Sequence, residues 1–419
     1  MNNLRGKKLL ILGGVQLACS VIKLAQQNGI YTIVVDYNED SPAKRIADKS
    51  YLVSTTDVDG IVELCKEEGI DGVFTSYIES MLPYCCIICE RLKLPFYATL
   101  EQIKITSNKK SFKELCRKNE VPVIEDFNIN IDDELFNVDY PVFTKPVDNS
   151  GARGMTICKN AEELKIGYQK ALEFSKSKEI LVEKYMDESS ECVNIDYLII
   201  DGEFYLVGVG DKSVYRTVNC TTPITSSVIY PSKFLEEYIC DLNEKVITMF
   251  QTIGIRNGYI FIEAFHDKNG FHFYEMGFRI GGGQYYVMNS QVTHVNFMEM
   301  LIRYSLTGHM LPEDKFSLKL SPDLSSKCCG LVILLSVGEI ASIDGLDEIL
   351  ALKDVVDFTQ MLFVGDVLQQ SDVGTLRQAF ARVYIVSKSN ESLKDAISKI
   401  YTILRINNPL GENLIIKNC

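Results

Sequence analysis

The chain has 419 residues, of which 46% are hydrophobic and 24% charged, a composition typical of a globular protein of about three domains. Its 43 Lys and Arg residues against 56 Asp and Glu residues give a net charge of −13, which argues against general nucleic-acid binding because phosphates need a basic surface. The sequence contains no apolar run of about 18 residues, so we expect no membrane span.

The cysteines and the N-terminal residues indicate a cellular compartment. Thirteen cysteines, an odd number, are spread along the chain, which favours reduced and mostly buried thiols over a disulfide framework. The first residues run directly into a short apolar segment and do not resemble a secretory signal. These features predict a cytoplasmic protein.

Strand-like and helix-like segments alternate over residues 1–105. Strands are expected at 8–12, 31–35 and 72–75, and helices at 58–68 and 81–92. This alternation predicts a parallel sheet in a Rossmann-like α/β domain.

Gly13 and Gly14 follow the first strand, and Asp36 closes the second, which is a weak indication of dinucleotide binding. The full G-x-G-x-x-G pattern is absent, so a tight strand-to-helix turn is the preferred interpretation. A nicotinamide-dependent oxidoreductase remains an alternative.

The middle of the chain changes from helices to long strands. A basic amphipathic helix is expected at 105–119, opening at Thr106-Ser107-Asn108. Asp201-Gly202 and Lys268-Asn269-Gly270 are hairpin-type turns. Further elements are expected as strands at 142–146, 180–185, 193–200, 204–210, 259–266 and 270–276, and a helix at 161–176. This pattern favours an α+β region. Beyond Pro312, strands at 330–336 and 381–386 and a helix at 392–403 predict a small C-terminal α+β domain.

Lys145 lies at the end of a predicted strand, before a loop of small residues that runs from Asp148 to Gly154. Backbone N–H groups in such a loop can bind phosphate oxygens, and the lysine adds a positive charge. The Walker A pattern is absent from the chain, which excludes a P-loop fold. An ordinary glycine-rich hairpin loop remains the alternative.

Glu263 and Glu275 lie in two predicted strands that are joined by a turn. In a hairpin the two carboxylates would face one another, repel and need a cation, for which Mg²⁺ is the natural choice. Arg279 follows shortly after. Two solvated glutamates on a hairpin face are the alternative.

Upstream, the Glu183–Met186 segment and Glu191 could present backbone groups to an adenine and a carboxylate to a ribose, although by themselves they read as ordinary strand-end residues.

The order of these features resembles the ATP-grasp superfamily of carboxylate–amine ligases. Residues 1–105 resemble its N-terminal Rossmann-like domain, and 106–311 its two ATP-grasp subdomains, with a lid at about 120–190. Residues 312–419 resemble the small C-terminal domain of the L-amino-acid-ligase branch. The whole arrangement is also similar to biotin carboxylase.

The resemblance implies a set of ATP-binding residues. Two lysines would contact the phosphates, a mobile glycine loop would close over them, and the hinge and two carboxylates would bind adenine and ribose. The two lysines would be Lys109 and Lys145, and the loop residues would be Ser150, Gly151 and Gly154. The hinge residues would be Lys184 and Met186, with Glu183 near the adenine amino group and Glu191 at the ribose.

The resemblance also implies that Glu263 and Glu275 bind Mg²⁺ or Mn²⁺, and that Arg279 steadies the transferred phosphate, with Lys145 as the second catalytic residue. The family pattern Glu-x-Asn-x-Arg usually supplies Asn as a further metal ligand, whereas this chain has Gly277 there. Either a water replaces this ligand or the second metal site is weakened.

The implied reaction is an ATP-dependent ligation. A substrate carboxylate takes the γ-phosphate to give an acyl phosphate and ADP, and an amine then displaces phosphate to form an amide. The expected partners are small carboxylates and amines, with amino acids first, and a homodimer is the default assembly. The alternatives are a bicarbonate-dependent carboxylase and a catalytically silent ATP-binding regulator.

Overall fold

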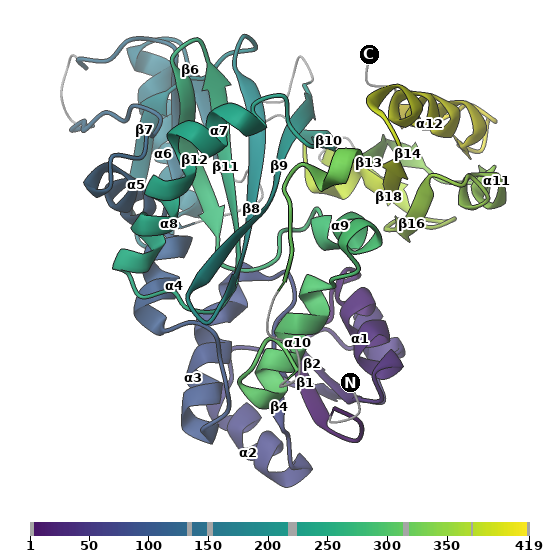
Figure 1. Ribbon diagram of the computed structural model, residues 1–419. Helices are drawn as coiled ribbons and strands as arrows, with labels where there is room; N and C mark the ends of the chain where they lie inside the picture. Colours follow the sequence, from purple (N-terminus) through teal and green to yellow (C-terminus); the bar gives the residue numbers. More distant parts are fainter. Residues whose placement is uncertain are drawn as a thin grey trace.

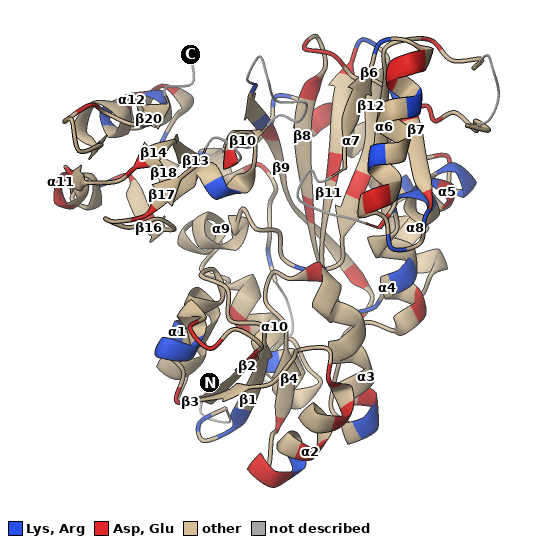
Figure 2. Cartoon of the chain, turned by 180° about the vertical axis from the view of Figure 1, so that it is seen from behind, with Lys and Arg blue, Asp and Glu red and all other residues tan. Residues whose placement is uncertain are grey.

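The computed structural model describes residues 4–131, 136–148, 154–216, 224–312, 318–369 and 372–416. Three parts follow one another along the chain (Figure 1). The N-terminal part lies at the bottom of the view, the long central strands at the upper left, and the C-terminal strands and helices at the upper right. Basic and acidic residues are interspersed over helices and loops in the opposite view (Figure 2).

The N-terminal part is a four-stranded parallel sheet in the order β3-β2-β1-β4, which confirms the predicted α/β unit. Its sheet is buried on both faces, because apolar runs such as Leu9–Leu12 pack under helices on either side. The strands are β1 (Lys8–Leu12), β2 (Tyr31–Asp36), β3 (Lys49–Leu52) and β4 (Gly72–Phe74); the helices are α1 (Ala18–Gln27), α2 (Val58–Glu68) and α3 (Leu82–Leu92), with short 3₁₀ turns η1 (Pro42–Arg45) and η2 (Glu79–Met81).

The prediction of a single helix at 105–119 is wrong, because this segment contains parts of two helices. Two helices, α4 (Leu100–Ser107) and α5 (Lys109–Lys118), meet at Asn108, whose backbone is extended. The Asn108 side chain accepts hydrogen bonds of 3.0 Å from the backbone N–H groups of Lys110 and Ser111. This N-cap starts α5 at Lys109 and fixes that lysine on the first turn.

A small three-stranded sheet, β6-β5-β7, forms the next unit, within the range predicted as the lid. It consists of β5 (Val142–Pro146), β6 (Thr156–Cys158) and β7 (Ile180–Lys184), and α6 (Ala161–Phe174) packs on β5 and β6. A separate apolar cluster around Val142, Leu164 and Val182 holds this unit together.

The largest element is a nine-stranded antiparallel sheet, which includes the path β12-β11-β8-β9-β10-β13-β18-β16. Strands of the C-terminal part pair directly with strands of the central part, since β13 pairs with β10. The expected domain limit near residue 312 therefore does not interrupt the hydrogen bonds of the sheet. The strands are β8 (Glu191–Ile200), β9 (Glu203–Tyr215), β10 (Ile224–Tyr230), β11 (Gly258–Asp267), β12 (Gly270–Gly277), β13 (Cys328–Ser336), β16 (Val355–Gln360), β18 (Ala379–Ser387) and β20 (Ile415–Ile416), which pairs with β13.

Helices cover this sheet and tie it to the N-terminal part. Helix α10 (Phe297–Thr307) packs against β4 and α1, so the chain returns to its first domain before it enters the C-terminal part. The remaining elements are α7 (Leu235–Asp241), α8 (Asn243–Thr252), α9 (Tyr285–Thr293), η3 (Leu324–Ser326), β14 (Gly338–Glu339), β15 (Ser342–Asp344), α11 (Leu346–Leu350), β17 (Val367–Leu368), η5 (Leu376–Gln378), α12 (Asn390–Ile403) and β19 (Arg405–Asn407).

Two further expectations can be compared with the structure. In the described ranges, none of the helices is both long and apolar enough to cross a membrane. The cysteines of the same ranges are all free thiols, and most of them are buried, as expected.

The cap at Asn108 gives a first prediction. Asn108→Ala should lower the free energy of unfolding by about 1 kcal/mol, because two backbone N–H groups lose their acceptor. Asn108→Asp keeps an acceptor oxygen and should lose little stability. Urea unfolding of both variants measures the effect, and equal stability of Asn108→Ala and the wild type would contradict the role of the cap.

Candidate functional site

A cavity of about 410 Å³ opens on one face of the nine-stranded sheet. Its volume lies within the range of small-molecule sites, about 300–1,000 Å³. All three parts of the chain contribute to its wall: Glu79 from the N-terminal part, Lys145 and Glu183 from the small sheet, and Arg382 from β18.

Two lysines share one buried carboxylate at this cavity. Lys145 Nζ lies 2.6 Å from Glu183 Oε2, and Lys113 Nζ lies 2.6 Å from Glu183 Oε1. Burial lowers the pKa of both lysines, while the two ammonium groups outweigh burial and lower the pKa of Glu183. Glu183 therefore fixes Lys145 in the cavity wall. The proposed contact of Glu183 with adenine stays a prediction, and Lys113, also 3.5 Å from Asp126, was missed.

The expected pair of carboxylates is confirmed as a pair: Glu263 on β11 lies directly opposite Glu275 on β12. Each already has a cationic partner, since Lys212 Nζ lies 2.6 Å from Glu263 and Lys109 Nζ lies 3.0 Å from Glu275. Tyr274 Oη also donates a 2.6 Å hydrogen bond to Glu263. Burial alone would raise the pKa of Glu263, but Lys212 and Tyr274 lower it.

The donor set at this pair fits a hard divalent cation. Among the described residues, no group of three or more His, Cys, Asp or Glu side chains is placed to hold a metal. Two adjacent carboxylates suit Mg²⁺, which commonly takes one or two protein carboxylates and completes its shell with water and phosphate oxygens. The role of Glu263 and Glu275 as metal ligands stays a prediction.

Phe261 explains why position 277 carries no side chain. Phe261 and Gly277 are opposite each other on β11 and β12, and a Cβ atom at Gly277 would lie only 2.2 Å from Phe261 Cε1. The ring thus occupies the space in which the Asn of the family pattern would begin. It also lies beneath Arg279, whose guanidinium carbon is 5.1 Å from the ring centroid.

Arg279 is held from two further sides. Its Nη2 lies 3.2 Å from Glu79 Oε2, and its Nη1 donates a 3.0 Å hydrogen bond to the Ile280 carbonyl. Burial raises the pKa of Glu79 even though Arg279 favours the ionised form. Sequence reasoning missed Glu79, because it lies 200 residues from Arg279 along the chain.

The residues predicted to bind adenine and ribose and those predicted to form the glycine loop over the phosphates are distributed unevenly. Lys184 and Met186 line the cavity, whereas Glu191 and Gly154 do not belong to its described lining. Glu191 is exposed and lies 2.5 Å from Lys233 Nζ. Gly154 is buried against Phe174 with a φ of +74°. Ser150 and Gly151 lie outside the described residues.

Asp196 is a carboxyl group that the sequence analysis missed. It is buried on β8 and accepts hydrogen bonds from Tyr259 Oη at 2.9 Å, Tyr230 Oη at 3.0 Å and Asn194 Nδ2 at 2.5 Å. Burial raises the pKa of Asp196 to about 7, although these hydrogen bonds favour the ionised form. Such a shifted carboxyl in a cavity wall is typical of a functional site.

Gln284 connects the three parts of the chain at the edge of the cavity. Its Nε2 donates to Tyr77 Oη of the N-terminal part at 2.7 Å, and its Oε1 accepts from Tyr384 Oη of β18 at 2.5 Å. The side chain is buried, so both groups depend on these partners. This bridge fixes the N-terminal and C-terminal walls of the cavity relative to each other.

The turn at Gly13-Gly14 is closed by the protein itself. The Gly14 N–H donates a 2.6 Å hydrogen bond to Asp36 Oδ2, and a Cβ atom at Gly14 would lie 2.2 Å from Ser41 Oγ. This arrangement favours the tight turn over a dinucleotide site.

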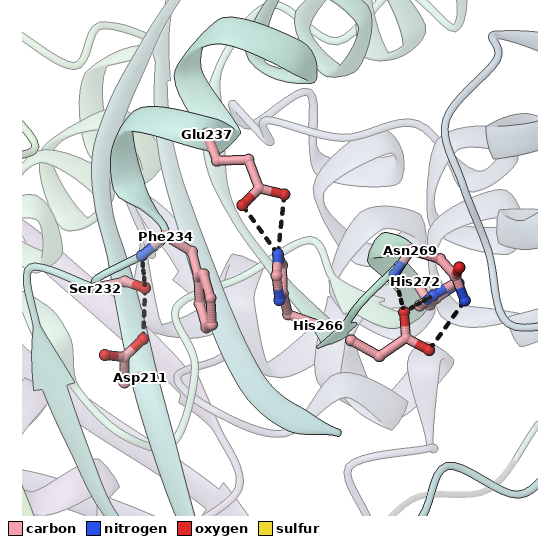
Figure 3. A network of polar contacts seen from close by, with 8 residues as sticks. Asp211, Ser232, Phe234, Glu237, His266, Asn269 and His272 are labelled. Atoms are coloured by element: carbon pink, nitrogen blue, oxygen red, sulfur yellow. Dashed lines mark hydrogen bonds and ion pairs between the residues drawn. The ribbon is translucent and has the colours of Figure 1, made fainter. Parts of the chain in front are cut away.

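The hairpin histidines form polar contacts (Figure 3), and neither of them belongs to the described cavity lining. His266 Nε2 lies 2.9 Å from Glu237 and its ring stacks on Phe234, with centroids 3.8 Å apart. His272 lies 2.8 Å from Asp267. The two rings therefore pair with acidic side chains and not with each other.

The contact between Phe261 and position 277 gives a second prediction. Gly277→Asn should lower the free energy of unfolding by about 1–3 kcal/mol through overpacking. The penalty should shrink in a Phe261→Ala background, because the ring no longer fills the space. Gly281→Ala is the matched control, since its Cβ would lie at an ordinary 3.5 Å from the same ring. An equal penalty in both backgrounds would refute the contact as its cause.

The buried Asp196 carboxyl gives a third prediction. Between the carboxyl pKa of the unfolded chain, about 4, and the folded value near 7, the native state binds more protons than the unfolded state. Asp196 therefore makes the free energy of unfolding fall as the pH rises through this window. Asp196→Asn should flatten the profile between pH 5 and 7, as measured by thermal unfolding, whereas exposed Asp241→Asn should not. A profile unchanged by Asp196→Asn would contradict the assignment.

Two families match successive parts of the chain. Residues 108–313 match the ATP binding domain of the carbamoyl-phosphate synthase L chain, and residues 9–91 match the PylC-like N-terminal domain. The formate-dependent phosphoribosylglycinamide formyltransferase of Sulfurisphaera tokodaii is 27% identical over 215 residues, which are 50% of this chain and 53% of that protein. The 2-oxoglutarate carboxylase small subunit of Hydrogenobacter thermophilus is 25% identical over 299 residues, 65% of this chain and 61% of that protein. The chain thus spans about half to three fifths of the length of these curated relatives.

Solved structures share the fold over nearly the whole chain. An L-amino acid ligase from Bacillus licheniformis superposes with a TM-score of 0.77 and 21% identity, covering 96% of this chain and 98% of that chain. The biotin carboxylase domain of the Hydrogenobacter thermophilus 2-oxoglutarate carboxylase gives 0.75 and 20%, covering 96% and 90%. That second structure is described as a dimer in complex with MgADP, ADP and bicarbonate. Residues 108–313 thus belong to the family of this ATP binding domain and residues 9–91 to the PylC-like family, in agreement with the predicted ATP-grasp arrangement.

Proposed function

We propose that this chain is an ATP-dependent ligase that joins a carboxylate to an amine through an acyl phosphate, releases ADP and phosphate, and uses amino acids as substrates. The observation that carries the proposal is the convergence of Lys145, Arg279 and the Glu263–Glu275 pair on one cavity. This set provides cations for a triphosphate and a pair of carboxylates for a divalent cation.

In the first step a carboxylate oxygen attacks the γ-phosphorus, the bond to the bridging oxygen breaks, and ADP leaves. In the second step the amine attacks the acyl carbon and a C–N bond forms, while phosphate leaves with the carboxylate oxygen and carries away the proton lost by the amine. Catalysis then consists mainly of positioning and charge neutralisation. Mg²⁺, when bound by Glu263 and Glu275, would neutralise charge on the phosphates.

The chain's own cations contribute in a defined way. Lys145, Lys109 and Arg279 each lie beside a carboxylate in the described structure, at 2.6, 3.0 and 3.2 Å. These carboxylates hold Lys145 and Arg279 in the cavity wall and Lys109 behind Glu275, and a nucleotide phosphate in the cavity can take over part of the pairing. A charge in this low-dielectric cavity acts more strongly than it would in water.

The likeness in fold to an L-amino acid ligase makes amino acids the first substrates to test. The matched relatives favour a second candidate, a ligase or carboxylase of a very small carboxylate. One of these relatives is named for formate, and the carboxylase domain of the other is described in complex with bicarbonate. The homodimer also stays a proposal, supported by the dimer described for that carboxylase domain.

The nucleotide products test the proposal directly. Purified protein with ATP, Mg²⁺ and pools of amino acids should release ADP and phosphate only with certain pools. AMP and pyrophosphate would contradict the acyl-phosphate mechanism. ADP release with bicarbonate or formate in the absence of amino acids would support the second candidate. Tight ATP binding without turnover on any substrate would favour the silent regulator.

Two substitutions give the fourth prediction. Lys145→Ala and Glu275→Ala should each lower the rate of ADP release by about 100-fold or more, because the first removes a cation at the phosphates and the second removes a carboxylate that would hold Mg²⁺ there. The fold should persist, since Lys113 still pairs with Glu183 in the first variant. Exposed Lys394→Ala and Glu391→Ala are the matched controls. Wild-type ADP release by either cavity variant would refute the assignment.

A further inference from the structure

Arg382 is a buried cation at the cavity that has no acidic partner among the described residues. Arg382 lies in β18 and is only 6% exposed, and within the described part of the chain its Nε and Nη1 atoms have no hydrogen-bond partner. Burial lowers its pKa. Three other cations of the wall differ in this respect, because Lys145, Lys212 and Arg279 each lie beside a glutamate.

The strand register places Arg382 on the cavity face of the sheet. Arg382 lies directly opposite Ile333 of β13, and Ile333 and Leu331 both line the cavity. Opposite residues of an antiparallel pair project to the same face, so the guanidinium belongs to the same wall.

The path of the sheet also separates Arg382 from the proposed phosphate site. The carboxylates Glu263 and Glu275 are on β11 and β12, at the other end of the strand order, and β8, β9, β10 and β13 lie between them and β18. Apolar side chains of Val228, Leu331 and Ile333 line the cavity in this interval.

A buried guanidinium without a partner destabilises the free protein, since its desolvation is not offset by a carboxylate. We propose that Arg382 recognises the non-reacting carboxylate of the amine substrate, an amino acid whose amino group forms the new amide. This inference rests on the proposed function, and it deepens that function by naming the group that selects the second substrate.

Charge balance favours a carboxylate over a phosphate as this anionic group. Arg382 supplies one positive charge, which matches a carboxylate, whereas a phosphate dianion would need a second cation. Arg216 also lines the cavity, but its Nη1 donates a 3.1 Å hydrogen bond to Tyr185 Oη. Tyr185 precedes Met186, in the segment proposed to bind adenine.

The test compares amines with and without a carboxylate. With the pools that give turnover, the wild type should use L-alanine far better than L-alaninamide as the amine, and better than 2-aminoethyl phosphate. Arg382→Gln should raise the KM for L-alanine by about 10- to 100-fold, the usual loss for a hydrogen bond to a charged group, and leave the KM for ATP unchanged. Arg382→Lys should restore part of the preference. A preference for the phosphate compound, or a preference for L-alanine that survives in Arg382→Gln, would overturn the proposal.

A binding measurement separates this inference from the proposed function. In the presence of Mg²⁺ and a non-hydrolysable ATP analogue, L-alanine should raise the Tm of the wild type more than L-alaninamide does, and this difference should vanish in Arg382→Gln. Exposed Arg405→Gln should keep it. An Arg382-dependent difference without ADP release from any amino-acid pool would refute the proposed ligase but support the carboxylate subsite.

The stability of the ligand-free protein provides a further test of the proposal for Arg382. Arg382→Gln should unfold at the same or a higher temperature than the wild type, because it removes an unpaired buried charge. A lower Tm together with an unchanged amine preference would show that Arg382 is structural and would overturn the inference.

Discussion

The cavity depends on one constraint, which is that a buried charge needs a partner. Glu183 satisfies two lysines at once, and the opposed Glu263 and Glu275 each accept a lysine of their own. These ion pairs allow several cations to lie at the cavity and be largely buried, where unpaired ions would destabilise the fold. They also keep the site prepared for a ligand of mixed charge, since a metal ion and a phosphate can exchange partners with a carboxylate and an ammonium.

The nine-stranded sheet extends this constraint across the molecule. Because β13 pairs with β10, hydrogen bonds continue from the ATP-binding strands into the C-terminal part. A single pleated face therefore presents carboxylates at one end and Arg382 at the other, and the residues between them are fixed by register. Gln284 holds the remaining wall, with one hydrogen bond to the N-terminal part and one to β18. The site belongs to the assembled chain, and no part of it carries the whole set.

Local patterns made much of the fold predictable. Asp201-Gly202 and Lys268-Asn269-Gly270 are turn residues, so the strands beside them and the opposition of Glu263 and Glu275 could be predicted from spacing. Strand β10 was not predicted, because Ser226 and Ser227 interrupt the alternation of apolar and polar residues that indicates a strand. Residues 105–119 were predicted as a single helix, because the charge pattern does not show that Asn108 ends one helix and caps the next.

The cavity partners were less accessible for a physical reason. Lys113 and Glu183 are 70 residues apart, and Arg279 and Glu79 are 200 apart, so no local spacing reports their contact. The position of Arg382 without an acidic partner among the described residues could not be predicted either, since it is a property of the packed sheet. Motifs identify residues that act through a fixed local geometry, whereas the residues that support them depend on tertiary packing.

The Phe261–Gly277 contact has a consequence for any redesign of this hairpin. An aromatic ring at 261 and a side chain at 277 compete for the same space, because a Cβ atom at 277 would lie 2.2 Å from Phe261 Cε1. A substitution at 277 alone therefore forces the ring or the two strands to shift. The two positions act as a coupled pair, and residue 261 sets how large a side chain β12 can carry at 277.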